Sequence, residues 1–307
     1  MMKRIRTALC LILAAALLAG CAFLPSESEP EALAPADPLT GHPLEWPGQR
    51  PVAVTIENST ASATQWGISS ASVVLEALTE AGMATELCLV YPALAATPKV
   101  GPVAAGQDIY WRLLVGQQPL PVQRGGGQFD QNYLDYYSIR AVDALEAGRT
   151  AFDCGSEWSN APLWYTSGSA VSKVLDALSI SAVLTESRVT SAASAAAASA
   201  SSGSDAVLTV PALLPQEEDG KLPDATAPDA VNVRVCFDDN NATGFAYDPD
   251  SGLYRMLHAD GTPQLDANNG QQAGFDNLLV LFSASALRDD GDRKSTRLNS
   301  SHESISR

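Results

Sequence analysis

The chain has 307 residues, 46% of them hydrophobic, and its 35 acidic and 19 basic side chains give a net charge of −16. A chain of this length can bury one large core or two modest ones. Because a strongly negative field repels phosphate groups, we expect neither nucleic acid nor anionic lipid headgroups as partners, whereas cations and basic proteins are permitted.

The first twenty residues have the three parts of a secretory signal: basic residues at positions 3, 4 and 6, an apolar run over 8–18, and small residues before Cys21. The apolar run is shorter than the ~20 residues that cross a bilayer. Small residues directly before a cysteine are typical of bacterial lipoproteins, in which the thiol receives lipid before the signal is cleaved. We therefore expect a signal peptide over 1–20 and an extracytoplasmic protein that the lipid on Cys21 anchors to the bacterial cell membrane. The alternative is an ordinary signal anchor with an incidental cysteine.

Residues 21–49 are rich in Pro, Glu and Ala. Such a segment cannot bury enough apolar surface to offset its loss of conformational entropy, so it predicts a flexible tether. The folded body is expected to begin at Arg50.

Residues 50–186 alternate predicted strands with predicted helices. Short apolar runs with β-branched residues predict strands over 51–57, 86–91 and 120–123. Apolar residues at helical spacing predict helices over 69–82, 107–115, 129–137 and 169–178. In the first of these, Ser69 or Ser70 would cap the helix and Gly82 would end it. The alternation indicates an α/β domain, a sheet with helices packed on it.

The C-terminal part differs in composition and period. Residues 187–229 form an Ala/Ser/Pro-rich insertion and linker. Runs with a period of two then predict a smaller β-rich domain over 230–292, with strands over 231–237, 243–247, 253–257 and 277–282 and a hairpin turn over 248–252. Residues 293–307 have no hydrophobic period and resemble translated adaptor sequence. We therefore expect that they are no part of the fold and that the domain before them is truncated.

Several segments together resemble the YerB-like lipoproteins, a bacterial family without an assigned activity. In chain order these segments are 38–41, 50–54, 57–58, 67–69, 76–82, 100–103, 125–126, 161–162, 165–166, 247–255 and 277–280. The resemblance implies a lipid anchor, an α/β N-terminal domain and a β-rich C-terminal domain.

The chain departs from that family where polar or cationic ligand groups would be expected. The resemblance implies basic residues or histidine, or His-Asn, at positions where this chain has Glu86, Ala104, Gln107, Gln123, Leu163 and Trp164. These replacements together imply a diverged copy whose ligand is altered or lost.

Nucleophilic catalysis is not indicated by the sequence. A serine or cysteine nucleophile needs a general base, usually histidine, and G-x-S-x-G is absent. The three histidines lie in the tether, in a predicted hairpin and in the tail: His42, His258 and His302. The later cysteines are far apart and form no C-x-x-C pair, so neither a zinc site nor a disulfide framework is predicted: Cys88, Cys154 and Cys236. Cys88 is expected to be a small buried core residue.

Three groups of residues could bind or react. Glu76 and Glu80 are four apart on the predicted helix; we interpret them as its solvated polar face, with an acid–base pair as the alternative. Gly125 to Gly127 lie between a strand and a helix and could hold an anion beside Arg124, although a tight turn explains them as well. Residues 238–241 and the Asp248 turn offer oxygen ligands without the spacing of a calcium loop, so no metal and no other cofactor is expected.

We therefore predict a non-catalytic module that binds a small ligand or an envelope protein in a cleft at the carboxyl ends of the strands. The expected ligand-binding residues are Glu57, Asn58, Glu76, Glu80, Gly101, Arg124, Gly125, Gly126 and Tyr165. A carboxylate-dependent hydrolase or transferase of the cell envelope, using Glu57, Glu76 or Glu80, is the alternative, and an accessory protein without a pocket is a third possibility.

Overall fold

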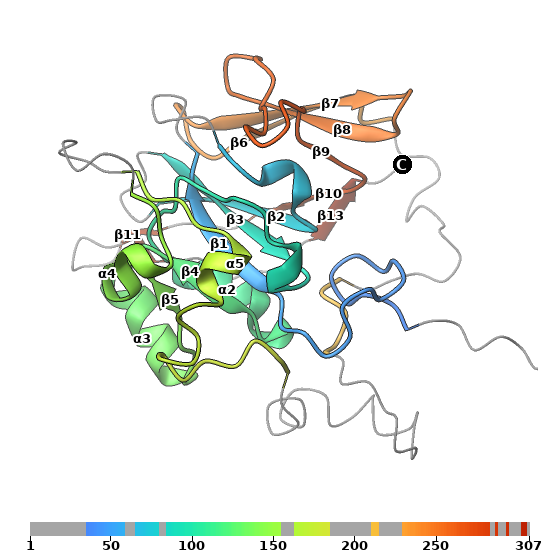
Figure 1. Cartoon of the computed structure of the whole chain (residues 1–307). Coiled ribbons are helices and arrows are strands. Elements are labelled where there is room, and N and C mark those ends of the chain that lie inside the picture. The colour runs from blue at the N-terminus through green and yellow to red at the C-terminus, as the bar shows by residue number, and fades with distance from the viewer. Residues whose placement is uncertain are drawn as a thin grey trace, which may run out of the picture. The chain divides into compact units, whose positions relative to one another are not determined.

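The computed structural model describes residues 35–58, 65–79, 84–154, 163–184, 210–214 and 229–282, and short strands at 286–287, 293–294 and 302–305. Figure 1 shows these elements in chain order. The predicted α/β part followed by a smaller β-rich part is confirmed, since a five-stranded sheet with helices precedes a separate four-stranded sheet. The predicted signal, Cys21, Glu80 and most of the predicted linker lie outside the described residues. None of the described helices combines the length and the apolar character of a membrane span.

The five-stranded sheet has the order β2-β3-β1-β4-β5. Its strands are β1 (Val52–Glu57), β2 (Val73–Leu78), β3 (Thr85–Tyr91), β4 (Leu120–Gln123) and β5 (Val142–Asp143). β3 is antiparallel to β1 and β2, whereas β4 is parallel to β1 and β5 is parallel to β4. The carboxyl ends of β1, β4 and β5 therefore meet at one edge of the sheet.

β1 is buried on both faces because alternate residues enter two different cores. Val54 and Ile56 belong to a first core that also contains Leu89 of β3. Ala53 belongs to a second core with Cys88. Cys88 is fully buried, as predicted, and its burial raises the pKa of its thiol. Strands covered on both faces appear in the sequence as continuous apolar runs, which is why β1 and β3 are predicted correctly.

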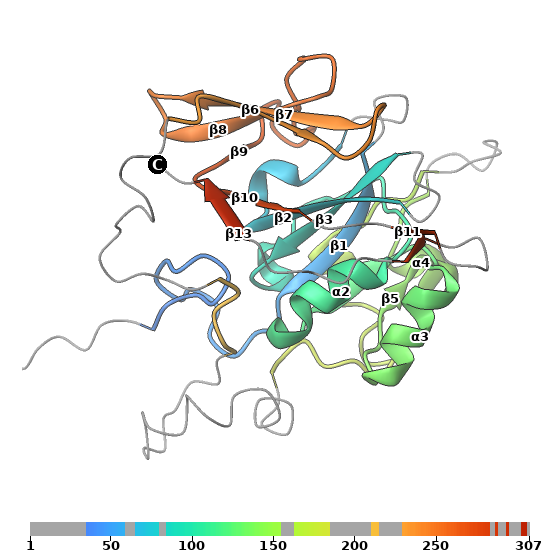
Figure 2. The same cartoon turned by 180° about the vertical axis from the view of Figure 1, so that it is seen from behind.

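Two helices cover the second core. α2 (Asp108–Leu114) and α3 (Gln128–Tyr136) confirm the helices predicted there, and Trp111 and Leu134 pack into the core. Figures 1 and 2 show both helices on the same face of the sheet.

Shorter helices complete this part of the chain. They are α4 (Ala144–Ala147), α5 (Gly168–Val171) and 3₁₀ turns at Ile68–Ser70, Leu94–Ala96, Val115–Gln117 and Gly148–Thr150. The helix predicted over 169–178 is realised only as α5, and turns follow it. Val174 and Leu175 in those turns still pack into the first core, so their apolar spacing reflects burial without a continuous helix.

The helix predicted over 69–82 is wrong. After the 3₁₀ turn the chain forms β2, which pairs with β3 from Val73↔Val90 to Leu78↔Thr85. The helical spacing misleads because β2 contacts both cores, with Val74 in the first and Val73 in the second, so its apolar residues do not alternate. The predicted polar helix face with Glu76 and Glu80 therefore does not form.

The four-stranded sheet is an antiparallel meander. Its strands are β6 (Asn232–Cys236), β7 (Ala242–Asp248), β8 (Leu253–Leu257) and β9 (Gly274–Phe275). The predicted hairpin turn joins β7 to β8, and Asp248 accepts a hydrogen bond from the Ser251 hydroxyl at 2.6 Å. Gly252 has φ 74°, a conformation that glycine adopts without strain.

The end of the chain pairs with earlier strands. β10 (Leu278–Leu281) is the predicted strand over 277–282 and is antiparallel to β13 (His302–Ile305). β11 (Ala286–Leu287) is antiparallel to β12 (Arg293–Lys294). β12 and β13 lie within residues 293–307, and the interpretation of this segment as an artefactual tail stays a prediction.

The packed chain begins before Arg50. Leu39 is buried in the second core, and isolated bridges join Ala36 to Pro43 and Gln49 to Val183. The flexible tether predicted over 21–49 is therefore wrong for residues 36–49. A few apolar side chains in this otherwise polar segment are enough to attach it to the core.

The four-stranded sheet packs on the first core. Met256 of β8 and Ala273 before β9 are buried in the same cluster as β1 and β3. The fully buried carboxylate of Asp266 accepts the backbone N–H groups of Gly67 and Ser69, both at 3.0 Å, and the Ser69 hydroxyl at 2.7 Å. The two sheets thus share a hydrophobic core and a buried polar contact.

Candidate functional site

The end of β1 places Asn58 in a hydrogen-bonded cluster with Glu76. Asn58 Nδ2 donates to Glu76 Oε1 and to Thr85 Oγ1, at 2.9 Å in each case. The hydroxyls of Thr85 and Thr243 donate to the same Glu76 oxygen, each at 2.7 Å. The cluster therefore connects β2 and β3 of the first sheet to β7 of the second.

The surroundings of Glu76 disfavour the ionised form of its side chain. Burial raises the pKa of Glu76, although the hydrogen bonds from Thr243, Thr85 and Asn58 lower it in part. The hydrogen-bond donors that reach it from the described residues are all neutral. A partly buried carboxylate whose pKa is raised in this way is a feature found at functional sites as well as in structural networks.

A polar cavity of about 190 Å³ lies beside this cluster. Its walls contain carboxamides, hydroxyls and an imidazole, and the lining residues are Asn58, Ala84, Thr85, Asn240, Asn241, Ala242, Thr243, His258, Ala259 and Gln264. Gln264 is only 1% exposed, and its Nε2 donates to Asn58 Oδ1 at 3.1 Å. We call this space the polar cavity; its volume suits a small polar molecule.

Sequence reasoning finds one residue of the polar cavity, Asn58, and misses the others. Gln264 lies 206 residues from Asn58 along the chain, and Thr243 lies 167 residues from Glu76. No local sequence pattern indicates that segments so far apart in the chain line the same cavity. The other described residues of the predicted site do not line this cavity: Glu57, Glu76, Gly101, Arg124, Gly125, Gly126 and Tyr165.

Glu57 and Glu76 point to opposite faces of the first sheet. The register pairs Glu57 with Glu86 and Glu76 with Leu87, and successive residues of a strand point to opposite faces. Leu87 belongs to the first core, whereas Glu86 accepts a hydrogen bond from Gln107 beside α2. Glu57 and Glu76 therefore cannot act as one pair of carboxylates.

The Arg124–Gly126 turn is held by carboxylates of the protein itself. Both oxygens of Asp143 lie 3.0 Å from the Gly125 nitrogen, which donates to them, and Gly125 has φ 68°. A Cβ on Gly126 would lie 2.0 Å from Asp130 Oδ2. These close approaches support the tight-turn interpretation of the glycines. Because two carboxylates stand beside the turn, the anion site considered from the sequence loses support.

Three positions that depart from the YerB-like pattern meet near this turn. Gln107 Nε2 donates to Glu86 Oε2, and Gln123 Nε2 donates to Asp130 Oδ2 at 2.9 Å. Gln123 Oε1 is buried and has no hydrogen-bond partner among the described residues. Amides and carboxylates thus occupy this edge of the sheet where the resemblance implies cations, which fits an altered ligand.

Gly101 and Tyr165 belong to a third place, beside Trp66. The Trp66 and Tyr165 rings form an edge-to-face pair with centroids 6.4 Å apart, and Lys99 Nζ lies 3.8 Å and 4.8 Å from their centroids. A Cβ on Gly101 would lie 2.7 Å from the Trp164 carbonyl oxygen. Gly101 therefore permits close packing. The described residues of the predicted site are distributed over three places around the end of β1.

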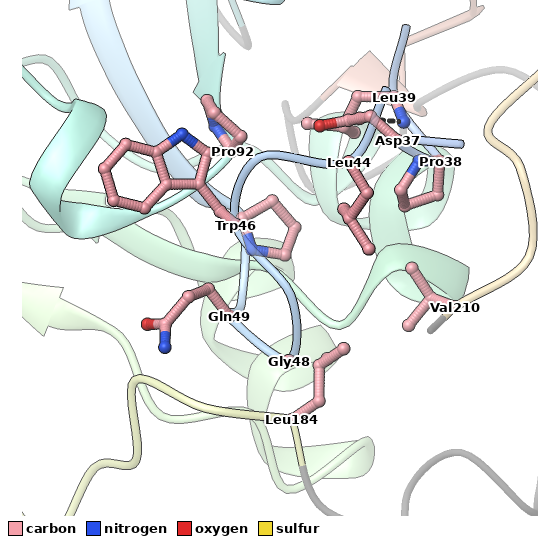
Figure 3. Close-up of a pocket in the computed structure, with 11 residues that line it drawn as sticks. Asp37, Pro38, Leu39, Leu44, Trp46, Gly48, Gln49, Pro92, Leu184 and Val210 are labelled. Carbon is pink, nitrogen blue, oxygen red and sulfur yellow. Dashed lines mark hydrogen bonds between the residues drawn. The ribbon is translucent and has the colours of Figure 1, made fainter. Parts of the chain in front are cut away.

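Figure 3 shows a second cavity, of about 20 Å³, where residues 37–51 meet the rest of the chain. Leu44 and Trp46 contribute to its lining, together with Leu184 and Val210. The volume admits about one water molecule. We attribute this small space to imperfect packing of the N-terminal segment.

No group of three or more His, Cys, Asp or Glu side chains that could hold a metal ion occurs in the part of the chain that the structure describes. Asp238 Oδ1 accepts the backbone N–H groups of Asn240 and Asn241 at 2.7 and 2.8 Å. This is the hydrogen bonding of an Asx turn. It accounts for the acidic and amide residues over 238–241.

Comparison with known proteins agrees with the order of the two sheets. Residues 39–181 match the N-terminal domain, and residues 232–305 the C-terminal domain, of "Protein of unknown function (DUF3048)". The Bacillus subtilis protein named "Putative lipoprotein YerB" is 25% identical over 268 residues, which are 86% of this chain and 72% of that protein. The crystal structure of YerB from Bacillus subtilis matches with a TM-score of 0.65 at 21% identity, over 85% of this chain and 79% of that one. The resemblance inferred from the sequence is confirmed, and the chain belongs to the DUF3048 family, as a homologue of YerB.

Proposed function

We propose that this protein is a lipoprotein held outside the bacterial cell membrane by lipid on Cys21, and that its folded part binds a small polar ligand without catalysing a reaction. The polar cavity carries the binding proposal. It lies between two packed sheets, a common position for ligand sites, and several polar side chains converge on it.

The walls of the polar cavity are polar, whereas cavities that stay empty in protein cores are apolar, so this space suits water or a polar ligand. Asn58 holds the Gln264 amide, and Glu76 holds the Thr243 hydroxyl, so these groups are fixed before a ligand arrives. Fixed side chains lower the entropy cost of binding. A polar ligand would replace the water molecules that a space of this kind holds.

Filling the polar cavity tests the proposal. Ala259 lines the cavity and is exposed, so Ala259→Trp can place an indole there without displacing a buried side chain. The full chain is purified and denatured, and the released small molecules are identified by mass spectrometry. We expect the wild type to release a small polar molecule, and the A259W variant to release about a tenth as much or less, because the bulky ring occupies the same space.

Ala95→Trp is the matched control, because Ala95 is also an exposed alanine but lies in the 3₁₀ turn Leu94–Ala96, outside the lining. It should release the same amount as the wild type. A folded wild type that releases nothing, or equal release from A259W and A95W, would count against a ligand in this cavity.

The carboxylate-dependent hydrolase or transferase has less support. Paired carboxyl groups that hydrolyse a glycoside lie about 5 to 9 Å apart on either side of one bond. Glu57 and Glu76 point to opposite faces of the sheet. A binding role requires no such pair.

The anchor is tested at Cys21. Cys21→Ser removes the thiol that would receive lipid, so we expect a protein that neither gains the mass of a lipid nor loses residues 1–20. The wild type should do both. Cys10→Ser, within the apolar run of the predicted signal, is the control and should be processed like the wild type. Intact-mass measurement of the three membrane-fraction proteins decides, and a lipid-sized gain in C21S would refute the assignment.

A further inference from the structure

One part of the polar-cavity wall can only accept hydrogen bonds from a ligand. Thr85 and Thr243 each have one hydroxyl proton, and each directs it to Glu76 Oε1 at 2.7 Å. Asn58 Nδ2 donates to Glu76 and to Thr85. The oxygens of these lining side chains therefore offer lone pairs to a ligand.

Other lining side chains can both donate and accept. Gln264 Nε2 donates one of its two hydrogens to Asn58 Oδ1 at 3.1 Å, and no described residue donates to Gln264 Oε1. Within the described part of the chain, the side chains of Asn240 and His258 have no hydrogen-bond partner. A carboxamide and a neutral imidazole each carry an N–H donor and an acceptor. The wall thus presents donors and acceptors next to one another.

Charged groups of both signs lie behind the wall of the polar cavity. The described lining residues include no Asp, Glu, Lys or Arg. Arg234 Nη1 donates to the carbonyl oxygen of the lining residue Ala259 at 3.0 Å, whereas Glu76 lies one hydrogen bond behind Thr243. A charged ligand would therefore leave water without an opposite charge in the lining to contact, which is costly. An uncharged ligand avoids this cost.

We propose that the polar cavity binds an uncharged molecule with neighbouring hydroxyl groups, a monosaccharide or a small polyol, an assignment that rests on the binding function proposed above. A hydroxyl group donates one hydrogen bond and accepts others. One hydroxyl of the ligand can therefore donate to the oxygen of a carboxamide such as Asn240 or Gln264, while its neighbour accepts from the NH₂ group of the same side chain. An apolar ligand would leave these buried polar groups unpaired.

Saturation-transfer NMR on the full chain, after dialysis to remove retained molecules, tests the ligand class. The uncharged probes are glucose, mannose, galactose and glycerol. The charged comparison compounds are glucosamine and glucuronate, which carry an ammonium or a carboxylate group on the glucose ring. We expect saturable binding of at least one uncharged probe, and binding of both charged compounds weaker than that probe by about tenfold or more. Preference for a hexose over glycerol distinguishes a monosaccharide ligand from a small polyol.

Two substitutions of Asn240 separate an uncharged ligand from a cation. Asn240→Asp replaces the NH₂ donor by an acceptor and adds a negative charge, so affinity for the best uncharged probe should fall about threefold or more, whereas a cation would bind more tightly. Asn240→Ala removes donor and acceptor together and should weaken binding by a similar factor. Both variants should keep the wild-type melting temperature, because Asn240 is exposed. Asn232→Asp and Asn232→Ala, at an exposed position of β6 outside the lining, are the controls and should bind like the wild type.

Tighter binding of glucosamine or glucuronate than of every uncharged probe would overturn the assignment of an uncharged ligand and leave the binding function standing. Equal affinities of N240D and N232D for the best uncharged probe would do the same. So would the absence of binding by all four uncharged probes while A259W still loses a retained molecule. A folded wild type that retains no molecule and binds none of the six compounds would overturn the binding function itself.

Discussion

Replacing Asp266 by asparagine is expected to lower the free energy of unfolding by about 3 kcal/mol, because a fully buried carboxylate loses acceptors for charged hydrogen bonds. Asp266 accepts backbone N–H groups from Gly67 and Ser69 at 3.0 Å and from Asn268 at 2.8 Å, and the Ser69 hydroxyl at 2.7 Å. An amide keeps one acceptor and turns its own N–H groups toward those donors. Urea unfolding at neutral pH measures the loss.

Asp260→Asn is the matched control for this change. Asp260 accepts the backbone N–H and the hydroxyl of Thr262 at 2.9 and 2.7 Å, but it is exposed and bonds only within its own turn. Its unfolding midpoint should remain close to that of the wild type. If D266N and D260N have the same midpoint of urea unfolding, the packing of the two sheets does not depend on the buried carboxylate.

Asp266 is also expected to make the protein less stable at low pH. Burial alone would raise the pKa of Asp266, but the hydrogen bonds from Ser69, Asn268 and Gly67 outweigh it, and the pKa lies below the usual 3.8. Because the folded pKa is the lower one, this contribution is present above about pH 4 and is lost as the pH falls through the folded value. The stability of D266N should therefore change less in acid than that of the wild type.

Replacing Asp130 by asparagine is expected to stabilise the protein at neutral pH by about 2 kcal/mol. Burial raises the pKa of the fully buried Asp130 to about 6, although hydrogen bonds from Trp111 and Gln123 lower it in part. Because the folded pKa is the higher one, the stability contributed by Asp130 is fully present below about pH 4 and is lost as the pH rises through about 6. An amide has no charge to bury, so this loss should disappear in D130N.

The surroundings of Asp130 can accept an amide. Gln123 Oε1 has no partner among the described residues, so a rotated Gln123 amide can take a hydrogen bond from the new NH₂ group. The measurement is the unfolding free energy of both proteins at pH 4 and pH 7. Asp135→Asn, at an exposed position of the same helix, is the control and should keep the wild-type pH profile. Lower stability of D130N at pH 7 than at pH 4, as in the wild type, would contradict the expectation.

The way in which the faces of each strand and helix are buried explains which of these elements the sequence predicts. β1 and β3 are continuous apolar runs because both faces are covered, and α2 and α3 present one apolar face to the second core. β2 has the same two-sided contacts as β1, yet its residues happen to recur at helical spacing, and pairing with β3 decides its structure. A local sequence pattern therefore predicts an element well only where the spacing of its apolar residues fits one type of secondary structure and not another.

The site is less predictable than the fold for a related reason. Asn58 and Glu76 could be named from the sequence, but the hydrogen bond between them depends on β2 being a strand with Glu76 on the same face as Leu87. Thr243 and Gln264 join them only because the second sheet packs on the first. Long-range packing, which no local pattern contains, assembles the polar cavity.

Asp266 and Ala273 come late in the chain. The first core can therefore be completed only when most of the chain is available. Gly67 meets Asp266 across 199 residues, so the turn before β2 stays without its acceptor until nearly the whole chain is available. Contacts of such long range make folding slow. A chain that crosses a membrane to reach the place proposed for it could therefore complete this contact only after the segment around Asp266 has crossed as well.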